Sequence, residues 1–216
     1  MNSTVDIPAI QNIDAESFDV IIIGAGLSGI GTAVRLQRDC PDRNFILLER
    51  REAIGGTWDL FRYPGIRSDS DMHTLGYDFK PWEAEKSIAD GPSILSYVNE
   101  TADEYRIRER IRFSQKLVAA DWCSERGQWE LTVDTPDGVR RYRCGFLMMC
   151  AGYYSYDQGY EPEFEGKASF DGEWVHPQFW PEDLDHAGKK VVVIGSGATA
   201  MTLVPNMSRQ AAHVTM

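Results

Sequence analysis

Two glycine-rich segments have the residue types and the spacing that hold the pyrophosphate of a dinucleotide. In a G-x-G-x-x-G/A segment, the first glycine permits a tight turn and the second lets the backbone approach the pyrophosphate. The small third residue lets the following helix pack closely, and that helix presents unpaired N–H groups and its positive dipole end to the phosphates. The defining residues are Gly24, Gly26 and Gly29 in the first segment, and Gly195, Gly197 and Ala200 in the second.

The first segment lies in the context that dinucleotide binding requires. A β-branched apolar run, 18–23, precedes it and predicts a strand buried on both faces. Apolar residues at helical spacing follow it and predict a helix that ends by Asp39, before Pro41. A second apolar strand, Phe45–Leu48, leads into Glu49, whose carboxylate is placed to accept a hydrogen bond from a ribose hydroxyl. Because this acid would repel a 2′-phosphate, the first site is expected to hold FAD or NAD rather than NADP.

The second segment repeats this order of elements. Lys190–Ile194 is predicted as a second buried strand, Met201–Met207 as a helix, and His213–Met216 as the next strand. Pro205 falls inside this helix and is expected to kink it or to end it early. These residues do not decide between NAD and NADP, because the selecting acid or arginine follows the second strand of such a unit.

A specific combination of aromatic, glycine and histidine residues lies between the two segments. It has the spacing Phe170-x-Gly172-x-x-x-His176-x-x-x-Trp180-Pro181. This spacing resembles the fingerprint of the type I Baeyer–Villiger flavin monooxygenases, which lies between an FAD-binding and an NADPH-binding module. The resemblance implies that His176 and Trp180 couple the two modules during catalysis. The alternative is a plain linker, in which Trp180 covers a domain seam and His176 hydrogen-bonds to the backbone.

The long aromatic stretch that follows the first module's second strand extends the resemblance. It has no regular period, which predicts a functional loop. Its G-G-T-W and R-Y-P-G segments resemble those that pack along the flavin ring in this family, which implies cofactor-binding roles for Gly56, Thr57 and Trp58. In the family, an aspartate soon after R-Y-P-G lies by the flavin and orients a catalytic arginine, and Asp69 matches that position. Asp71 is an adjacent alternative, and a turn or helix cap is the structural interpretation of either aspartate.

The stretch between the aromatic loop and the fingerprint predicts a helix followed by strands. The helix is expected to begin at Pro92. A short strand at 111–113 and three antiparallel strands at 116–123, 128–133 and 139–144 follow, and then another buried strand, Phe146–Cys150. A three-strand meander inserted in a Rossmann unit is typical of glutathione-reductase-like flavoproteins, which agrees with FAD.

The predicted fold class is therefore α/β, with a Rossmann-type FAD-binding module that carries the meander and the start of a second, NADP-binding Rossmann module. The expected organisation is a disordered lead (1–16), an incomplete FAD-binding domain (17–152), a linker with the fingerprint (153–186) and the start of an NADP-binding domain (187–216).

The resemblance implies an FAD- and NADPH-dependent monooxygenase that inserts one oxygen of O₂ into ketones, giving esters or lactones. One branch of the family also oxygenates sulfide or thioamide sulfur. The resemblance further implies that the chain matches the N-terminal part of such an enzyme, with the catalytic arginine and the substrate cap outside it. A flavin monooxygenase confined to N- or S-oxygenation is one alternative, although its fingerprint usually lacks the Trp180-Pro181 ending. A non-catalytic flavin-binding remnant is another, because a half-built sheet has an open apolar edge and tends to aggregate.

Composition limits the classes of partner. The net charge of −11 and the isoelectric point of about 4.8 argue against a surface for nucleic acid or anionic membranes. No apolar run approaches ~18 residues, so no membrane span is expected, and the lack of signal-peptide features favours the cytoplasm. The four cysteines form no C-x-x-C pair, which argues against a zinc site and against a disulfide reductase. The expected partners are O₂ and a small ketone or sulfur compound, and the oligomeric state is left open.

Overall fold

A computed structural model describes residues 15–216, which group into two compact units. The first unit comprises the described residues up to Ala53 together with Arg106–Ala151, and the second comprises Ile54–Tyr105 together with Gly152–Met216. Each unit is thus built from two separate stretches of the chain, and the predicted domain ranges, which follow sequence order, stay predictions. Residues 1–14 of the predicted disordered lead lie outside the described part, and its last residue, Glu16, is not disordered but begins the first strand.

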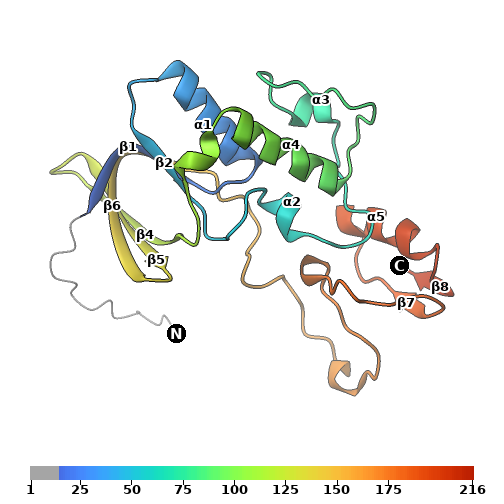
Figure 1. The fold of residues 1–216 in the computed structure, drawn as a ribbon. Helices are drawn as coiled ribbons and strands as arrows, with labels where there is room; N and C mark the ends of the chain where they lie inside the picture. Colours follow the sequence, from blue (N-terminus) through green and yellow to red (C-terminus); the bar gives the residue numbers. More distant parts are fainter. Residues whose placement is uncertain (1–14) are drawn as a thin grey trace. The chain divides into compact units, whose positions relative to one another are not determined.

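A six-stranded mixed sheet forms the first unit (Figure 1). Its strands are β1 (Glu16–Ile23), β2 (Phe45–Leu48), β3 (Ile111–Arg112), β4 (Lys116–Cys123), β5 (Gln128–Thr135) and β6 (Gly138–Met149). Their spatial order is β3-β2-β1-β6-β5-β4. The pairs β1–β2, β2–β3 and β1–β6 are parallel, whereas β4–β5 and β5–β6 are antiparallel. The parallel part and the meander therefore share one sheet, joined at β6.

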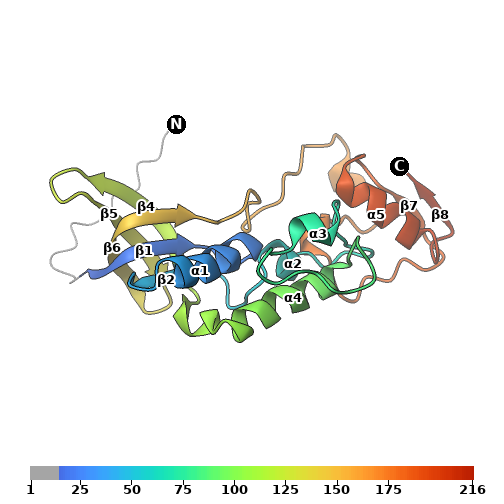
Figure 2. The ribbon, with the colours of Figure 1, turned by 90° about the horizontal axis from the view of Figure 1, so that it is seen from above.

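Apolar side chains explain why β1 and β2 lie at the centre of the parallel part. The last four residues of β1 and all of β2 are buried, with Val20 paired to Phe45 and Ile23 to Leu48. Helix α1 (Leu27–Asp39) connects these strands and lies along one face of them (Figure 2). A core cluster joins both strands to the meander, and its buried members are Ile21, Ile23, Ile46, Leu48, Leu131, Val133, Tyr142 and Cys144.

Strand β6 corrects two predictions, because it is one strand rather than two and its second half is not buried. Its first half pairs antiparallel with β5 as far as Cys144, and Tyr142–Met149 pairs parallel with β1. Beyond Cys144, β6 pairs with β1 alone among the described strands. The side chains of Phe146 and Met149 are each 61 % exposed. A single strand serves both neighbours because successive backbone groups of a strand point to opposite edges.

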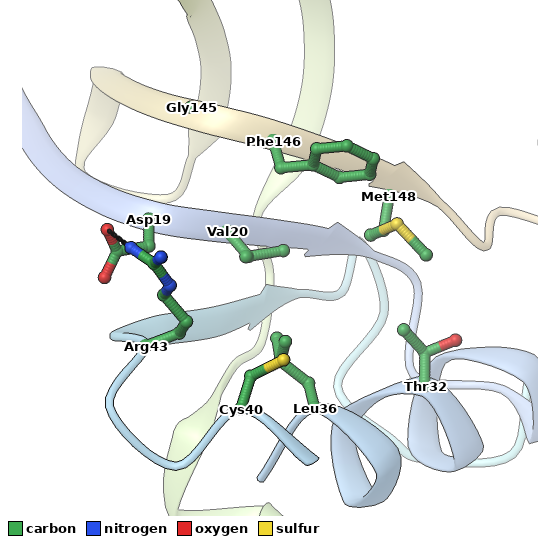
Figure 3. A pocket seen from close by; sticks show the side chains of 9 residues that line it. All are labelled: Asp19, Val20, Thr32, Leu36, Cys40, Arg43, Gly145, Phe146 and Met148. Carbon is green, nitrogen blue, oxygen red and sulfur yellow. Dashed lines mark ion pairs between the residues drawn. The ribbon is translucent and has the colours of Figure 1, made fainter.

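The open stretch of β6 borders a hollow of about 420 Å³ on the α1 side of the sheet (Figure 3). Side chains from α1, β1 and β6 line it, including Leu36, Phe146 and Met148. An ion pair between Arg43 and Asp19, with 3.6 Å between Nη1 and Oδ1, lies at its edge. Exposed apolar side chains beside an unpaired strand edge favour association with another strand.

The second unit combines short helices with a two-stranded parallel sheet. Its elements are α2 (Thr57–Leu60), α3 (Met72–Leu75), α4 (Gly91–Glu104), β7 (Lys190–Val192), α5 (Ala198–Met207) and β8 (His213–Thr215), with 3₁₀ turns at Lys167–Ser169 and Pro177–Phe179. Helix α4 begins as predicted, with Pro92 in its first turn and the Asp90 carboxylate accepting the Ser93 N–H at 2.9 Å. In the part of the chain that the structure describes, no helix combines the length and apolar character needed to cross a membrane.

An apolar cluster holds the second unit together. Phe61 and Tyr63 pack with Leu203 and Met207 of α5, and Trp180 lies against them. The strand predicted as buried at 190–194 is instead largely exposed, because Val192 is 69 % and Ile194 is 64 % exposed. Pro205 does not end α5 early, since the helix continues to Met207.

The exposed half of β6 predicts self-association of the isolated chain. We expect the double substitution Phe146→Lys and Met149→Lys to lower the apparent molecular mass of the chain in sedimentation at micromolar concentration. Charged side chains on an open edge repel a second strand and remove the apolar surface that would bury there.

A matched control is Tyr160→Lys, which changes a side chain that is 87 % exposed outside any strand and is expected to leave the mass unchanged. Equal self-association by the double variant and the wild-type chain would contradict the prediction.

Candidate functional site

Gly24 is the tightest point of the turn between β1 and α1. It has φ +103°, a conformation that favours glycine. Its N–H donates to the Leu48 carbonyl at 2.8 Å. A Cβ at this position would lie 2.5 Å from the carbonyl oxygen of Cys150, so the turn passes directly over the end of β6 and admits no side chain.

Gly29 brings the first turn of α1 against this loop. A Cβ on Gly29 would lie only 1.9 Å from the Gly24 carbonyl oxygen. The helix starts after Gly26, whose carbonyl accepts the Ile30 N–H at 3.0 Å. No side chain caps this helix N-terminus and its first turn has no acidic residue, so no residue of the helix itself neutralises the positive end of its dipole. An anionic group of a ligand fits there.

Glu49 holds the loop from the end of β2. Its side chain is almost fully buried, and its Oε2 accepts the Ala25 N–H at 2.7 Å while its Oε1 accepts the Arg51 N–H at 2.9 Å. Hydrogen bonds from backbone N–H groups to a carboxylate contribute about 1.5–3 kcal/mol each. Glu49 therefore fixes the backbone of the glycine loop, a role that its position after the strand did not indicate. Each carboxylate oxygen has a second lone pair with which it can accept a ribose hydroxyl.

The second glycine loop has the same order of elements but open surroundings. Gly195 has φ +129°, and α5 begins after Gly197 with no capping side chain and no acid in its first turn. A Cβ on Gly195 or on Gly197 would meet nothing within 4 Å. Gly197 has φ −76°, which any residue adopts, so neither packing nor backbone conformation of the described chain requires a glycine there. Ala200, at the third position, is buried against the unit.

The predicted flavin-side residues form the start of helix α2. Gly56 is its N-cap with φ +55°, Thr57 is its first residue, and the Trp58 N–H donates to the Gly55 carbonyl at 3.1 Å. Gly55 has φ +123°, and a Cβ there would lie 2.3 Å from Leu95 Cδ1 of α4. Gly55 thus brings this turn close to α4 within the second unit.

The two candidate aspartates differ in their surroundings. Asp71 caps α3, because its carboxylate accepts the Thr74 N–H at 2.9 Å, and this bond lowers the pKa of Asp71. Asp69 is exposed and lies near Tyr154. Burial raises the pKa of the Tyr154 phenol to about 12, with smaller contributions from Tyr153, from Tyr63 and from the charge of Asp69. The capping alternative thus describes Asp71, and Asp69 keeps its carboxylate available to a partner.

The fingerprint segment is held inside the second unit by local hydrogen bonds and by packing. His176 Nδ1 accepts the Gln178 N–H at 3.2 Å, and its ring lies where a Cβ on Gly159 would be, 2.3–2.6 Å away. Gln178 is buried and donates from Nε2 to the Ser155 carbonyl at 2.6 Å. Gln178 was not among the predicted residues, although its place within the fingerprint is a signal for it. Trp180 packs into the apolar cluster around Phe61, so both fingerprint side chains contact protein in this structure.

The predicted site residues divide between the two units. The first unit contains Gly24, Gly26, Gly29 and Glu49, and the second contains Gly56, Thr57, Trp58, Asp69, His176, Trp180, Gly195, Gly197 and Ala200. The structure brings the first set together around one uncapped helix N-terminus. Within the second set it joins Trp180 to the body of α5 and leaves the N-terminus of that helix open.

Comparison with known proteins identifies a matching family. The description of the matching family is flavin-binding monooxygenase-like, and the match runs over residues 17–216. The chain belongs to this family. The FAD-containing monooxygenase EthA of Mycolicibacterium smegmatis is 58 % identical over 202 residues, which cover 93 % of this chain and 41 % of that protein. The chain thus spans about two fifths of the length of the curated relatives it matches.

Solved structures of Baeyer–Villiger monooxygenases share the fold. The structure of OTEMO in complex with FAD and NADP matches with a TM-score of 0.76 at 31 % identity, covering 93 % of this chain and 39 % of that one. Cyclohexanone monooxygenase from Rhodococcus sp. Phi1, bound to NADP⁺, matches with a TM-score of 0.78 at 28 % identity, covering 93 % and 38 %. The resemblance and the α/β fold predicted from the sequence are confirmed.

The contrast between the two loops gives a prediction for stability. We expect Gly29→Ala to lower the free energy of unfolding by roughly 3 kcal/mol, because the clash with the Gly24 carbonyl outweighs the gain of about 1 kcal/mol in helix propensity. Gly197→Ala meets open space and should change it by less than about 0.5 kcal/mol. Urea denaturation followed by circular dichroism measures both, and equal losses in the two variants would contradict this account.

Proposed function

We propose that this chain carries the cofactor-binding portion of an FAD- and NADPH-dependent monooxygenase of the Baeyer–Villiger type. The observation that carries the proposal is the pair of uncapped helix N-termini, each preceded by a glycine turn, with the fingerprint Phe170–Pro181 between them in the sequence. The family membership and the solved relatives with FAD and NADP support it.

FAD is assigned to the loop around Gly24, Gly26 and Gly29. Gly24 and Gly26 carry no side chain that would block a pyrophosphate, and the uncapped α1 N-terminus supplies the positive field. Glu49 would accept a ribose hydroxyl while holding the loop, and its charge disfavours a 2′-phosphate at this position. The residues present therefore fit FAD better than NADP.

NADPH is assigned to the loop around Gly195, Gly197 and Ala200. The open space in front of Gly195 and Gly197 is available to a ligand, and a side chain there would fill it. Ala200, at the third position of this motif, is small and buried, as close packing of the helix requires. The fit is to a pyrophosphate, and the preference for NADPH over NADH is supported by the relatives with bound NADP.

When bound, NADPH supplies a hydride and FAD activates O₂ for transfer of one oxygen to the substrate. The chain's own contribution is to bind and orient the two cofactors. Trp58 would pack along the flavin, and the exposed carboxylate of Asp69 would orient a cationic group that stabilises negative charge there. His176 and Trp180 fasten the fingerprint inside the second unit, which suits a role in positioning the NADP loop rather than in proton transfer.

Two alternatives remain open. A monooxygenase that oxygenates only nitrogen or sulfur would use the same two loops. A chain that binds flavin without catalysis would also have them, and the exposed edge of β6 favours association over turnover in that case. The substrate that is oxygenated thus distinguishes the first alternative from the proposed function. The presence of any product distinguishes the second alternative from both.

Product analysis tests the proposal. Because the chain spans about two fifths of its relatives, it is joined to the remaining part of the EthA sequence of Mycolicibacterium smegmatis. The purified chimera is supplied with FAD, NADPH and ¹⁸O₂, and with either cyclohexanone or methyl phenyl sulfide. We expect ε-caprolactone that is two mass units heavier by mass spectrometry. Sulfoxide as the sole product would favour the N- or S-oxygenating alternative, and bound cofactors with no product would favour the non-catalytic one.

A further inference from the structure

The segment 55–66, which contains the proposed flavin-side residues, is held by close backbone contacts at three glycines. Gly55 faces Leu95 of α4, as described above. Near the other end of the segment, Gly91 at the start of α4 donates its N–H to the Ile66 carbonyl at 2.9 Å, and a Cβ on Gly91 would lie 2.9 Å from Ile66 Cγ2. These two contacts fasten the segment to α4, and the third fastens it to a different helix.

The third contact joins Gly65 to α5, the helix that follows the second glycine loop. Gly65 has φ +83°, and a Cβ there would lie 2.0 Å from Asn206 Nδ2, 2.6 Å from Asn206 Cγ and 2.9 Å from the Thr202 carbonyl oxygen. The Asn206 amide is itself held, because its Nδ2 donates to the Thr202 carbonyl at 2.7 Å. The backbone at Gly65 is therefore in close contact with the Asn206 side chain, whose position is fixed by its own hydrogen bond.

The apolar cluster of the second unit packs next to this contact. Phe61 and Tyr63 of the segment are both buried against Leu203 and Met207, which flank Asn206 on α5. Their rings meet edge to face, with 6.0 Å between centroids. A shift of α5 along or around its axis would have to move these rings and the Gly65 backbone together, because packed interiors do not deform continuously.

We propose that Asn206 is a positioning residue that seats the 55–66 segment on α5, so that a nucleotide bound at the N-terminus of α5 and the placement of the segment are coupled. This inference rests on the proposed function, which assigns NADPH to that N-terminus. Asn206 lies eight residues after Ala198, about 12 Å along the helix axis. A rigid helix carries the effect of a ligand at its first turn over this distance, and coupling of this kind is reciprocal.

The test compares Gly65→Ala, Asn206→Ala and the double variant in the 216-residue chain. Calorimetry gives the Kd for NADP⁺, and thermal unfolding gives Tm. We expect Gly65→Ala to weaken NADP⁺ binding at least fivefold, because its new methyl group pushes on the Asn206 side chain. The double variant should recover part of that loss, because both Asn206 contacts of the methyl group are gone and only the contact with the Thr202 carbonyl oxygen at 2.9 Å remains.

Gly188→Ala is the matched control. Gly188 lies just before β7 in the same unit, with φ +67° and nothing within 4 Å of a Cβ. Its substitution brings a comparable backbone strain without a contact, so Tm should fall while the Kd for NADP⁺ stays unchanged.

Three outcomes would overturn the inference or its basis. If Gly65→Ala raises the Kd for NADP⁺ no more than Gly188→Ala does, the contact between Gly65 and Asn206 stabilises the fold without affecting nucleotide binding. A double variant that binds no better than Gly65→Ala would show that Asn206 is not the partner. A wild-type chain that does not bind NADP⁺ would contradict the proposed function. The contact between Gly65 and Asn206 would then be tested by Tm alone, and Tm losses of the two single variants that simply add in the double variant would contradict it.

Discussion

The first unit depends on the close approach of three backbone segments at Gly24. The end of β1, the start of α1 and the end of β6 meet there with no room for a side chain, and the buried Glu49 carboxylate ties the loop to the end of β2. A buried carboxylate is costly unless it is hydrogen-bonded, and both of its oxygens accept backbone N–H groups here. Since the Glu49 side chain and the glycines constrain one another, the cradle is preorganised before any ligand arrives.

The second unit is stabilised by different contacts. Its β7–β8 sheet has two strands, and a pair of strands alone stabilises little. The apolar cluster on α5 and the glycine contacts of the 55–66 segment supply the packing instead. This arrangement leaves the N-terminus of α5 facing open space while the body of the helix is fixed, which is a combination that suits binding of a large anionic ligand.

Local patterns in the sequence predicted most of the elements that bear the site. The apolar run of β2, the helix that ends before Pro41 and the strand at Lys116–Cys123 form where the patterns placed them. Each of these is decided by side chains near in sequence, through periodicity, a breaker or β-branching. The glycine spacing likewise predicted both turns, because a turn before a helix has few alternatives.

The failures concern contacts between residues far apart in sequence. The division of β6 into two strands was wrong, because parallel pairing with β1 continues the strand from Cys144 to Phe146 and beyond. The burial of β6 and β7 was overestimated, because an apolar strand is buried only where a neighbouring element covers it. Three contacts depend on tertiary distances that sequence spacing does not encode. They are the hydrogen bond of Glu49 to the glycine loop, that of Gln178 to Ser155, and the contact of Asn206 with Gly65.

The most direct test of the central claim, that the Glu49-held loop is an FAD cradle, is a fluorescence titration of FAD with the purified chain. Wild-type and Glu52→Ala chains, the latter changing an exposed neighbouring acid, should quench FAD fluorescence with equal affinity. Glu49→Ala should bind at least tenfold more weakly, equivalent to about 1.4 kcal/mol, with its helical circular dichroism recorded on the same sample. A wild-type chain that leaves FAD fluorescence unchanged, or a Glu49→Ala chain that binds as tightly as the wild type, would contradict the account.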